Sequence, residues 1–97
     1  MDYYVLRLER GGPWDWSRDM REQEGWGDHA RFMDDLVDQG KIVLGGPLED
    51  VHYTMHIVEA ESEQAVRDLF ATDPWWVNGM LRPVQIERWT ILLDGRG

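Results

Sequence analysis

The 97-residue chain is long enough for one small domain, residues 1–97, because two domains would each fall below the usual size of an independent hydrophobic core. Its 19 acidic and 10 basic residues give a formal net charge of −9, which repels phosphate backbones and anionic lipid and argues against nucleic-acid and membrane partners. The absence of cysteine excludes disulfides and thiolate sites, and the lack of a signal-like or membrane-length apolar run leads us to expect a cytoplasmic location.

The first part of the chain predicts a strand followed by a long connection. Residues 3–9 (YYVLRLE) are rich in aromatic and β-branched side chains, as is typical of a strand. Residues 11–25 combine glycine, proline and many charges, and a connection of this length commonly serves as a lid or a binding loop. Its Trp14 and Trp16 indicate that it folds over something apolar.

A helix and a pair of strands are predicted next. From Trp26 onward, apolar residues recur at helical spacing with acidic residues on the other face, and Gly40 suits the left-handed position just beyond a helix. A short strand over residues 42–44 then meets residues 45–47 (GGP), which we interpret as a turn. Residues 53–60 form the next strand, so the polar residues between the two strands suit a hairpin loop.

The last part of the chain predicts a second helix, a short helical turn and a final strand. Ser62 is a good N-cap for the second helix. Asp73 and Pro74 suit the N-cap and the first position of the short turn. Residues 83–93 (PVQIERWTILL) then form the last strand.

The order of these elements indicates an α+β fold of the ferredoxin-like βαββαβ type, with a four-stranded antiparallel sheet. Both helices should cover one face of the sheet, because βαβ crossovers are right-handed. The strands carry bulky side chains at successive positions, whereas a sheet with one wet face should alternate apolar with polar residues. We therefore predict a homodimer, in which a second copy of the chain covers the open face.

His29 and Asp73 are the first candidates for chemistry. His29 lies at the edge of the apolar stripe of its helix, so its ring should point toward the sheet or its rim. It is either a structural histidine bonded to a backbone carbonyl or a general acid or base, since histidine exchanges protons near neutral pH. Asp73 is either an N-cap alone or the group that orients a histidine across the domain.

The other two histidines do not indicate a metal site. His52 and His56 share one face of a strand, but roughly 13 Å of extended chain separates them. No spacing resembles a metal-binding signature, so we predict no metal. Trp75 and Trp76 are adjacent on a short turn and cannot both face the core, so one of them should line a pocket or an interface.

Taken in order, these pieces resemble the YCII-related domain family over nearly the whole chain. The most specific parts are His29 within REQEGWGDHARFMDDL, the segment GGPL at residues 45–48, and ATDPWWVNG at residues 71–79. The resemblance implies a ferredoxin-like fold that dimerises into an α+β barrel, with His29 and Asp73 as an active-site pair in a cleft. It also implies an architecture similar to that of lactone isomerases, and one branch is similar to dehydrochlorinases that act on chlorinated hydroxyquinols.

Pattern and resemblance together predict a cofactor-free enzyme of the lyase, isomerase or dehydrochlorinase type, acting in a dimer cleft on a small substrate, with aromatic molecules among the candidates. Asp73 would accept the N–H of one ring nitrogen of His29, and the other nitrogen would take a proton from the substrate. The alternative is a non-catalytic homodimer that binds a small ligand or regulates. The candidate substrate-binding residues are Arg7, as an anion partner, and Trp14, Trp16, Trp75 and Trp76.

Overall fold

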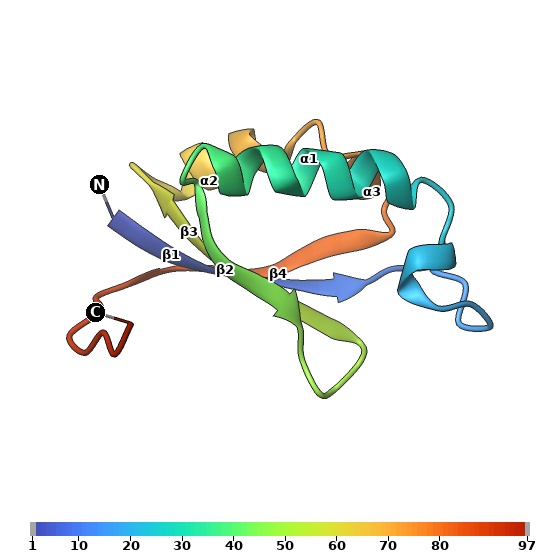
Figure 1. The fold of residues 1–97 in the computed structure, drawn as a ribbon, viewed down its shortest axis with the longest axis horizontal. Helices are drawn as coiled ribbons and strands as arrows, with labels where there is room; N and C mark the ends of the chain where they lie inside the picture. The colour runs from blue at the N-terminus through green and yellow to red at the C-terminus, as the bar shows by residue number, and fades with distance from the viewer. Residues whose placement is uncertain (1, 97) are drawn as a thin grey trace.

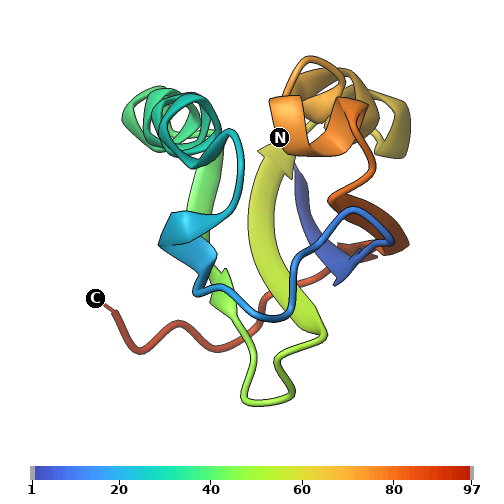
Figure 2. The ribbon, with the colours of Figure 1, turned by 90° about the vertical axis from the view of Figure 1, so that its right-hand side faces the viewer.

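The computed structural model describes residues 2–96 and confirms the predicted α+β fold with βαββαβ order. The four strands form one antiparallel sheet in the order β2-β3-β1-β4, consistent with a ferredoxin-like fold. All three helices lie on one face of this sheet (Figures 1 and 2). The elements in chain order are β1 (Asp2–Arg10), the 3₁₀ turn η1 (Met20–Glu22), α1 (Trp26–Asp38), β2 (Ile42–Pro47), β3 (Tyr53–Ala60), α2 (Glu63–Phe70), α3 (Pro74–Val77) and β4 (Leu81–Trp89).

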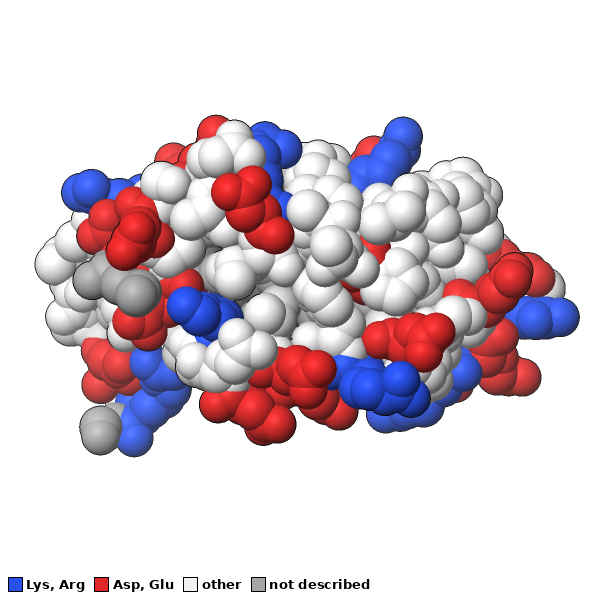
Figure 3. Space-filling view, turned by 90° about the horizontal axis from the view of Figure 1, so that it is seen from above, with Lys and Arg blue, Asp and Glu red and all other residues white. Residues whose placement is uncertain are grey.

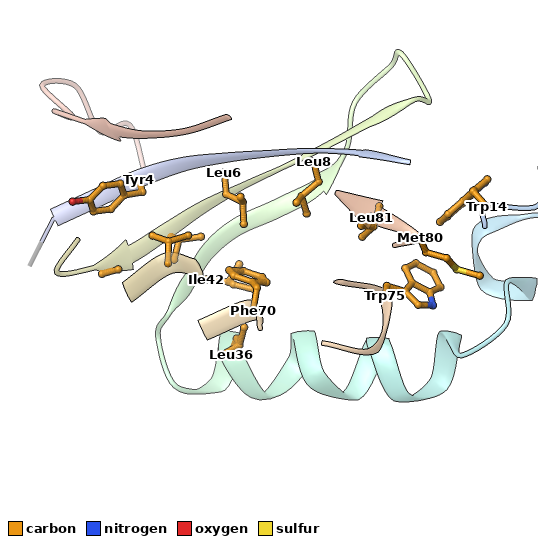
Figure 4. Packing of buried hydrophobic residues seen from close by; sticks show 13 residues of the cluster. Tyr4, Leu6, Leu8, Trp14, Leu36, Ile42, Phe70, Trp75, Met80 and Leu81 are labelled. Carbon is orange, nitrogen blue, oxygen red and sulfur yellow. The ribbon is translucent and has the colours of Figure 1, made fainter. Parts of the chain in front are cut away.

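The hydrophobic core lies between the helices and the sheet. Along β1, Tyr4, Leu6 and Leu8 are buried and face the helices (Figure 4), while the residues between them face the open side. The helices contribute buried side chains such as Leu36 from α1 and Phe70 from α2. Each fully buried side chain of this kind contributes about 1.5–3 kcal/mol to folding, so the alternation along β1 fixes which face the helices cover.

The helix boundaries follow from local capping. The Ser62 hydroxyl accepts a hydrogen bond from the Ala65 N–H at 3.0 Å, as predicted for an N-cap. At the end of α1, Gly40 has a φ of 75°, the left-handed conformation that favours glycine. Among residues 2–96, no helix is long and apolar enough to cross a membrane.

The predicted bounds of the last strand were wrong. β4 begins at Leu81, which pairs with Arg10, and ends at Trp89, which pairs with Tyr3. Beyond this pair, residues 90–93 leave the sheet. Pro83 lacks an N–H but lies within β4, where it is tolerated because β4 is an edge strand.

The prediction of a turn at residues 45–47 was also wrong, because β2 continues through them. Gly45 pairs with His56, and Pro47 pairs with Thr54. A Cβ atom at residue 45 would overlap the imidazole ring of His56, so the glycine there makes room for a side chain of the neighbouring strand. The glycine therefore serves close packing in a strand rather than a change of chain direction.

Candidate functional site

A cavity of about 320 Å³ lies between α1 and the helix-covered face of the sheet, at the end of the sheet where β1 and β2 finish. Its walls come from all four strands, from α1 and α3 and from the connection after β1, so the fold as a whole assembles it. They include Trp14 from the connection after β1, His29 from α1, Gly45 from β2, His56 from β3 and Trp75 from α3. Figure 2 looks onto this end of the molecule, where the connection crosses from the end of β1 to α1.

The structure places His29 on the wall of this cavity, in direct contact with the buried Asp73 behind it. His29 Nδ1 lies 2.8 Å from Asp73 Oδ1, and the two residues are only 7% and 2% exposed. The same Asp73 oxygen accepts the backbone N–H of Trp75 at 3.2 Å, so Asp73 caps α3 and holds His29 at once. Because an ionised carboxylate can only accept, the proton of a neutral His29 belongs on Nδ1, and Nε2 carries a free lone pair.

Trp75 fixes the orientation of the His29 ring. The two rings stack with centroids 4.0 Å apart and planes 10° apart. Trp75 is itself held by a hydrogen bond from its indole Nε1–H to the Glu24 carbonyl at 2.9 Å. Trp26 lies beside both rings, with its ring centroid 5.7 Å from that of Trp75 and 5.9 Å from that of His29. His29 is therefore a positioned group, bonded on one edge and stacked on one face.

The predicted substrate-binding tryptophans divide into two groups. Trp14 is 5% exposed and meets Trp75 edge to face, with ring centroids 5.3 Å apart, and both line the cavity with His29. Trp16 is 52% exposed and lies beside His52 outside the cavity. Trp76 packs against Phe70, and it too is absent from the cavity wall. Only one tryptophan of each predicted pair thus reaches the site.

The connection that carries Trp14 is ordered by one buried glutamine. The Gln23 side chain is 3% exposed and donates to the carbonyl oxygens of Asp15 at 2.6 Å and Arg18 at 3.1 Å. Its own carbonyl accepts the Asp15 N–H at 2.9 Å. These three bonds satisfy backbone groups that no sheet or helix satisfies, so residues 11–25 form a folded wall of the cavity rather than a structureless loop.

His56 also lines the cavity, although the sequence did not single it out for chemistry. Burial lowers the pKa of His56 to about 4; the nearby His29 adds to this lowering and the Asp73 carboxylate opposes it. Its Nδ1 is buried against Gly45 and has no hydrogen-bond partner. The period-two alternation of β3 was the available signal, because it places residue 56 on the same face as the buried Thr54 and Val58.

The structure brings a different arginine to the cavity from the one predicted. Arg7 lies on the open face of the sheet, with its guanidinium carbon 4.3 Å from the Tyr53 ring centroid, and does not line the cavity. Arg10 lines the cavity, with its guanidinium carbon 4.2 Å from the Trp14 ring centroid. Along β1, Arg10 is an even number of residues from Leu6 and Leu8, so its side chain lies on the same helix-covered face of the sheet. Arg7 is an odd number of residues away and lies on the opposite face.

The titratable side chains offer no ready metal site. Within residues 2–96, no three His, Asp or Glu side chains come together in a way that could hold a metal ion. His52 instead pairs with Asp50 at the surface, with 2.8 Å between Nδ1 and Oδ1 and side chains that are 66% and 59% exposed. The chain thus holds two His–Asp pairs with the same separation, and only the His29–Asp73 pair is buried.

Comparison with known proteins identifies the family. No curated protein matches the chain. A family model described as the YCII-related domain matches residues 1–90, which include every element of the sheet and every residue of the cavity wall. The chain therefore belongs to the YCII-related domain family.

Proposed function

We propose that this protein is an enzyme that moves a proton on a small, partly aromatic molecule, with His29 as the base. The observation that carries the proposal is the buried 2.8 Å contact between Asp73 and His29, which lines the cavity. A histidine bonded through one nitrogen to a carboxylate, with its other nitrogen free, is the arrangement that general-base catalysis requires. The apolar and aromatic walls suit a substrate of the same character.

In the proposed reaction, His29 Nε2 removes a proton from a carbon next to a carbonyl group of the substrate. The C–H electron pair moves toward the carbonyl oxygen, and the Asp73 carboxylate stabilises the imidazolium that forms. The proton then returns to another carbon, which is an isomerisation, or a leaving group departs with its bonding electrons, which is an elimination. These are the reaction classes that the family resemblance implies.

We assign His56 to the oxygen on which negative charge develops. Its Nδ1 faces Gly45 without a partner, and a buried lone pair is tolerated more readily than a buried N–H, so the proton of neutral His56 belongs on Nε2. Nε2 is also the ring nitrogen that Gly45 does not shield. A neutral imidazole N–H in a poorly hydrated cavity can stabilise an enolate without giving up its proton, because its low pKa leaves it uncharged at neutral pH.

The test is uptake of deuterium from D₂O by candidate substrates. We expect NMR to show exchange into at least one member of a panel of unsaturated lactones, cyclic enones and hydroxylated or chlorinated aromatic compounds. His29→Gln should lower the exchange rate by about 10²- to 10⁴-fold. His52→Gln is the matched control, since His52 has the same 2.8 Å carboxylate contact at the exposed surface, and it should leave the rate unchanged.

Two results would count against catalysis by His29. Equal exchange rates in His29→Gln and the native protein would exclude His29 as the base. A compound that quenches tryptophan fluorescence saturably, yet never exchanges or changes, would favour the alternative of a protein that only binds a small ligand.

We also propose that the protein is a homodimer joined through the open face of the sheet. Apolar side chains remain exposed on this face, among them Leu44 at 56% and Trp89 at 45%. A second copy of the same face would bury them in a two-fold contact. Light scattering at micromolar concentration should give a mass about twice the 11.4 kDa of one chain; a mass of one chain would contradict the dimer.

A further inference from the structure

Arg10 differs from most arginines of this chain in its surroundings. Five of the other arginines form ion pairs with carboxylates, namely Arg18, Arg31, Arg82, Arg88 and Arg96. Within residues 2–96, Arg10 has no carboxylate within ion-pair distance, and its buried Nε has no hydrogen-bond partner. Arg7 shares both features but lies on the open face of the sheet, whereas Arg10 lines the cavity. A protein with a formal net charge of −9 has ample carboxylates, so a partly buried cation without a carboxylate on a cavity wall indicates a place for an outside anion.

The position of Arg10 is set by the sheet and by Trp14. Arg10 is the last residue of β1, paired with Leu81 of β4 and on the helix-covered face. Its guanidinium lies over the Trp14 ring at 4.2 Å, an arrangement stabilised by cation–π attraction. Stacking occupies a face of the planar group, so its N–H donors stay free along the edges, in a side chain that lines the cavity.

The charges around the cavity favour an anion at Arg10. Burial lowers the pKa of Arg10, as expected for a partly desolvated guanidinium, which nevertheless keeps its charge at neutral pH. Among residues 2–96, the only carboxylate on the cavity wall is that of Asp34, an exposed residue of α1. On the outer surface over the helices, acidic and basic side chains are interspersed (Figure 3).

We propose that Arg10 binds the anionic group of the molecule that occupies this cavity, and that this molecule is a small planar carboxylate. This inference rests on the proposed function and names its substrate class. The forked guanidinium matches a carboxylate with two parallel hydrogen bonds. The rings of Trp14 and Trp75 form the wall beside it and suit a flat, unsaturated body. At about 320 Å³, the cavity is at the small end of ligand sites, which are roughly 300–1,000 Å³.

The arrangement also orients the substrate. Arg10 belongs to β1, His29 to α1 and His56 to β3, so these three side chains reach the cavity from separate elements. An anion held at Arg10 fixes one end of a planar molecule and leaves the rest of it to meet the two histidines. Such anchoring of a non-reacting group is a common way to place a reacting carbon against its base.

The experiment compares benzoate with benzamide, two planar probes of nearly the same shape that differ in charge. Binding is measured by quenching of tryptophan fluorescence, because Trp14 and Trp75 line the cavity. We expect benzoate to bind the native protein more tightly than benzamide, and Arg10→Gln to weaken benzoate binding by about 10- to 100-fold while benzamide binding stays unchanged. Arg67→Gln, which removes a charge from an exposed position of α2, should alter neither affinity.

Several outcomes would overturn the anion site. Equal affinities for the two probes, no saturable binding of benzoate, or an equal loss of both affinities in Arg10→Gln would show that Arg10 only packs against Trp14. Loss of benzoate binding in Arg7→Gln but not in Arg10→Gln would assign the anion to the open face of the sheet instead. Melting temperatures of all variants verify that they remain folded.

The proposed function can fail separately. His29→Gln should still bind benzoate more tightly than benzamide, because the charge discrimination depends on Arg10 and not on His29. If benzoate binding depends on Arg10 while no carboxylate ever exchanges deuterium, the anion site is supported and catalysis by His29 is contradicted. If exchange depends on His29 but is as fast for neutral substrates as for carboxylates, catalysis by His29 is supported and the anion site is contradicted.

Discussion

Replacing Asp73 with asparagine is expected to lower the rate of proton transfer by about 10²- to 10⁴-fold while leaving ligand affinity nearly unchanged. Asparagine caps a helix about as well as aspartate, so α3 and the Trp75 N–H bond should persist. A neutral amide, however, cannot stabilise the positive charge that His29 acquires, nor does it enforce the tautomer with a free Nε2. The measurement is kcat and KM for the compound identified by deuterium exchange, with the loss confined to kcat.

The exposed pair of His52 and Asp50 supplies the control for this substitution. Asp50 contacts His52 at the same 2.8 Å but is exposed, so Asp50→Asn should change neither kcat nor KM. Asp73→Ala is a second comparison, because it also removes the cap and should cost about 1 kcal/mol of unfolding free energy. If Asp73→Asn keeps kcat within about twofold of the native value, Asp73 is only the cap of α3 and the proposed mechanism is wrong.

Most of the fold could be predicted because the local capping signals and the pattern of apolar residues indicated the same helices and strands. The caps at Ser62 and Asp73 and the left-handed Gly40 each act within a few residues, and all were confirmed. The errors came where a distant strand decides the outcome. β4 lasts only as far as its pairing with β1, and residues 45–47 remain a strand because β3 lies beside them.

The site was predictable only in part, for a similar reason. The contact between His29 and Asp73 joins residues 44 positions apart, and the family resemblance pointed to it before the structure showed it. Arg10 and His56 carry no motif, and their approach to the cavity follows from strand faces that meet α1 and the connection. Counting alternate residues from Leu6 and Leu8 would have favoured Arg10 over Arg7, since strand parity is readable from sequence.

Acidification from pH 7 to pH 4 is expected to cost the folded protein about 3 kcal/mol through His56 alone. In the unfolded chain His56 takes up a proton near its ordinary pKa of 6.5, whereas in the fold its pKa is lowered to about 4, chiefly by burial. Between these values the unfolded state binds more protons, so stability is full above pH 6.5 and falls as the pH drops toward 4. A loss of this size is a large part of the 5–15 kcal/mol typical of a domain.

The measurement is the free energy of unfolding in urea at pH 7 and pH 4, for the native protein and for His56→Gln. Other groups also contribute to the pH dependence of stability, so the informative quantity is the difference between the two pH dependences. Glutamine is polar but cannot take up a proton, and the variant should lose about 3 kcal/mol less than the native protein on acidification. Equal losses in both proteins would mean that His56 is not held neutral by burial. The role assigned to His56 at the substrate oxygen would then be wrong. His29 becomes positively charged when it accepts the substrate proton, and a protonated His56 in the same cavity would repel that charge.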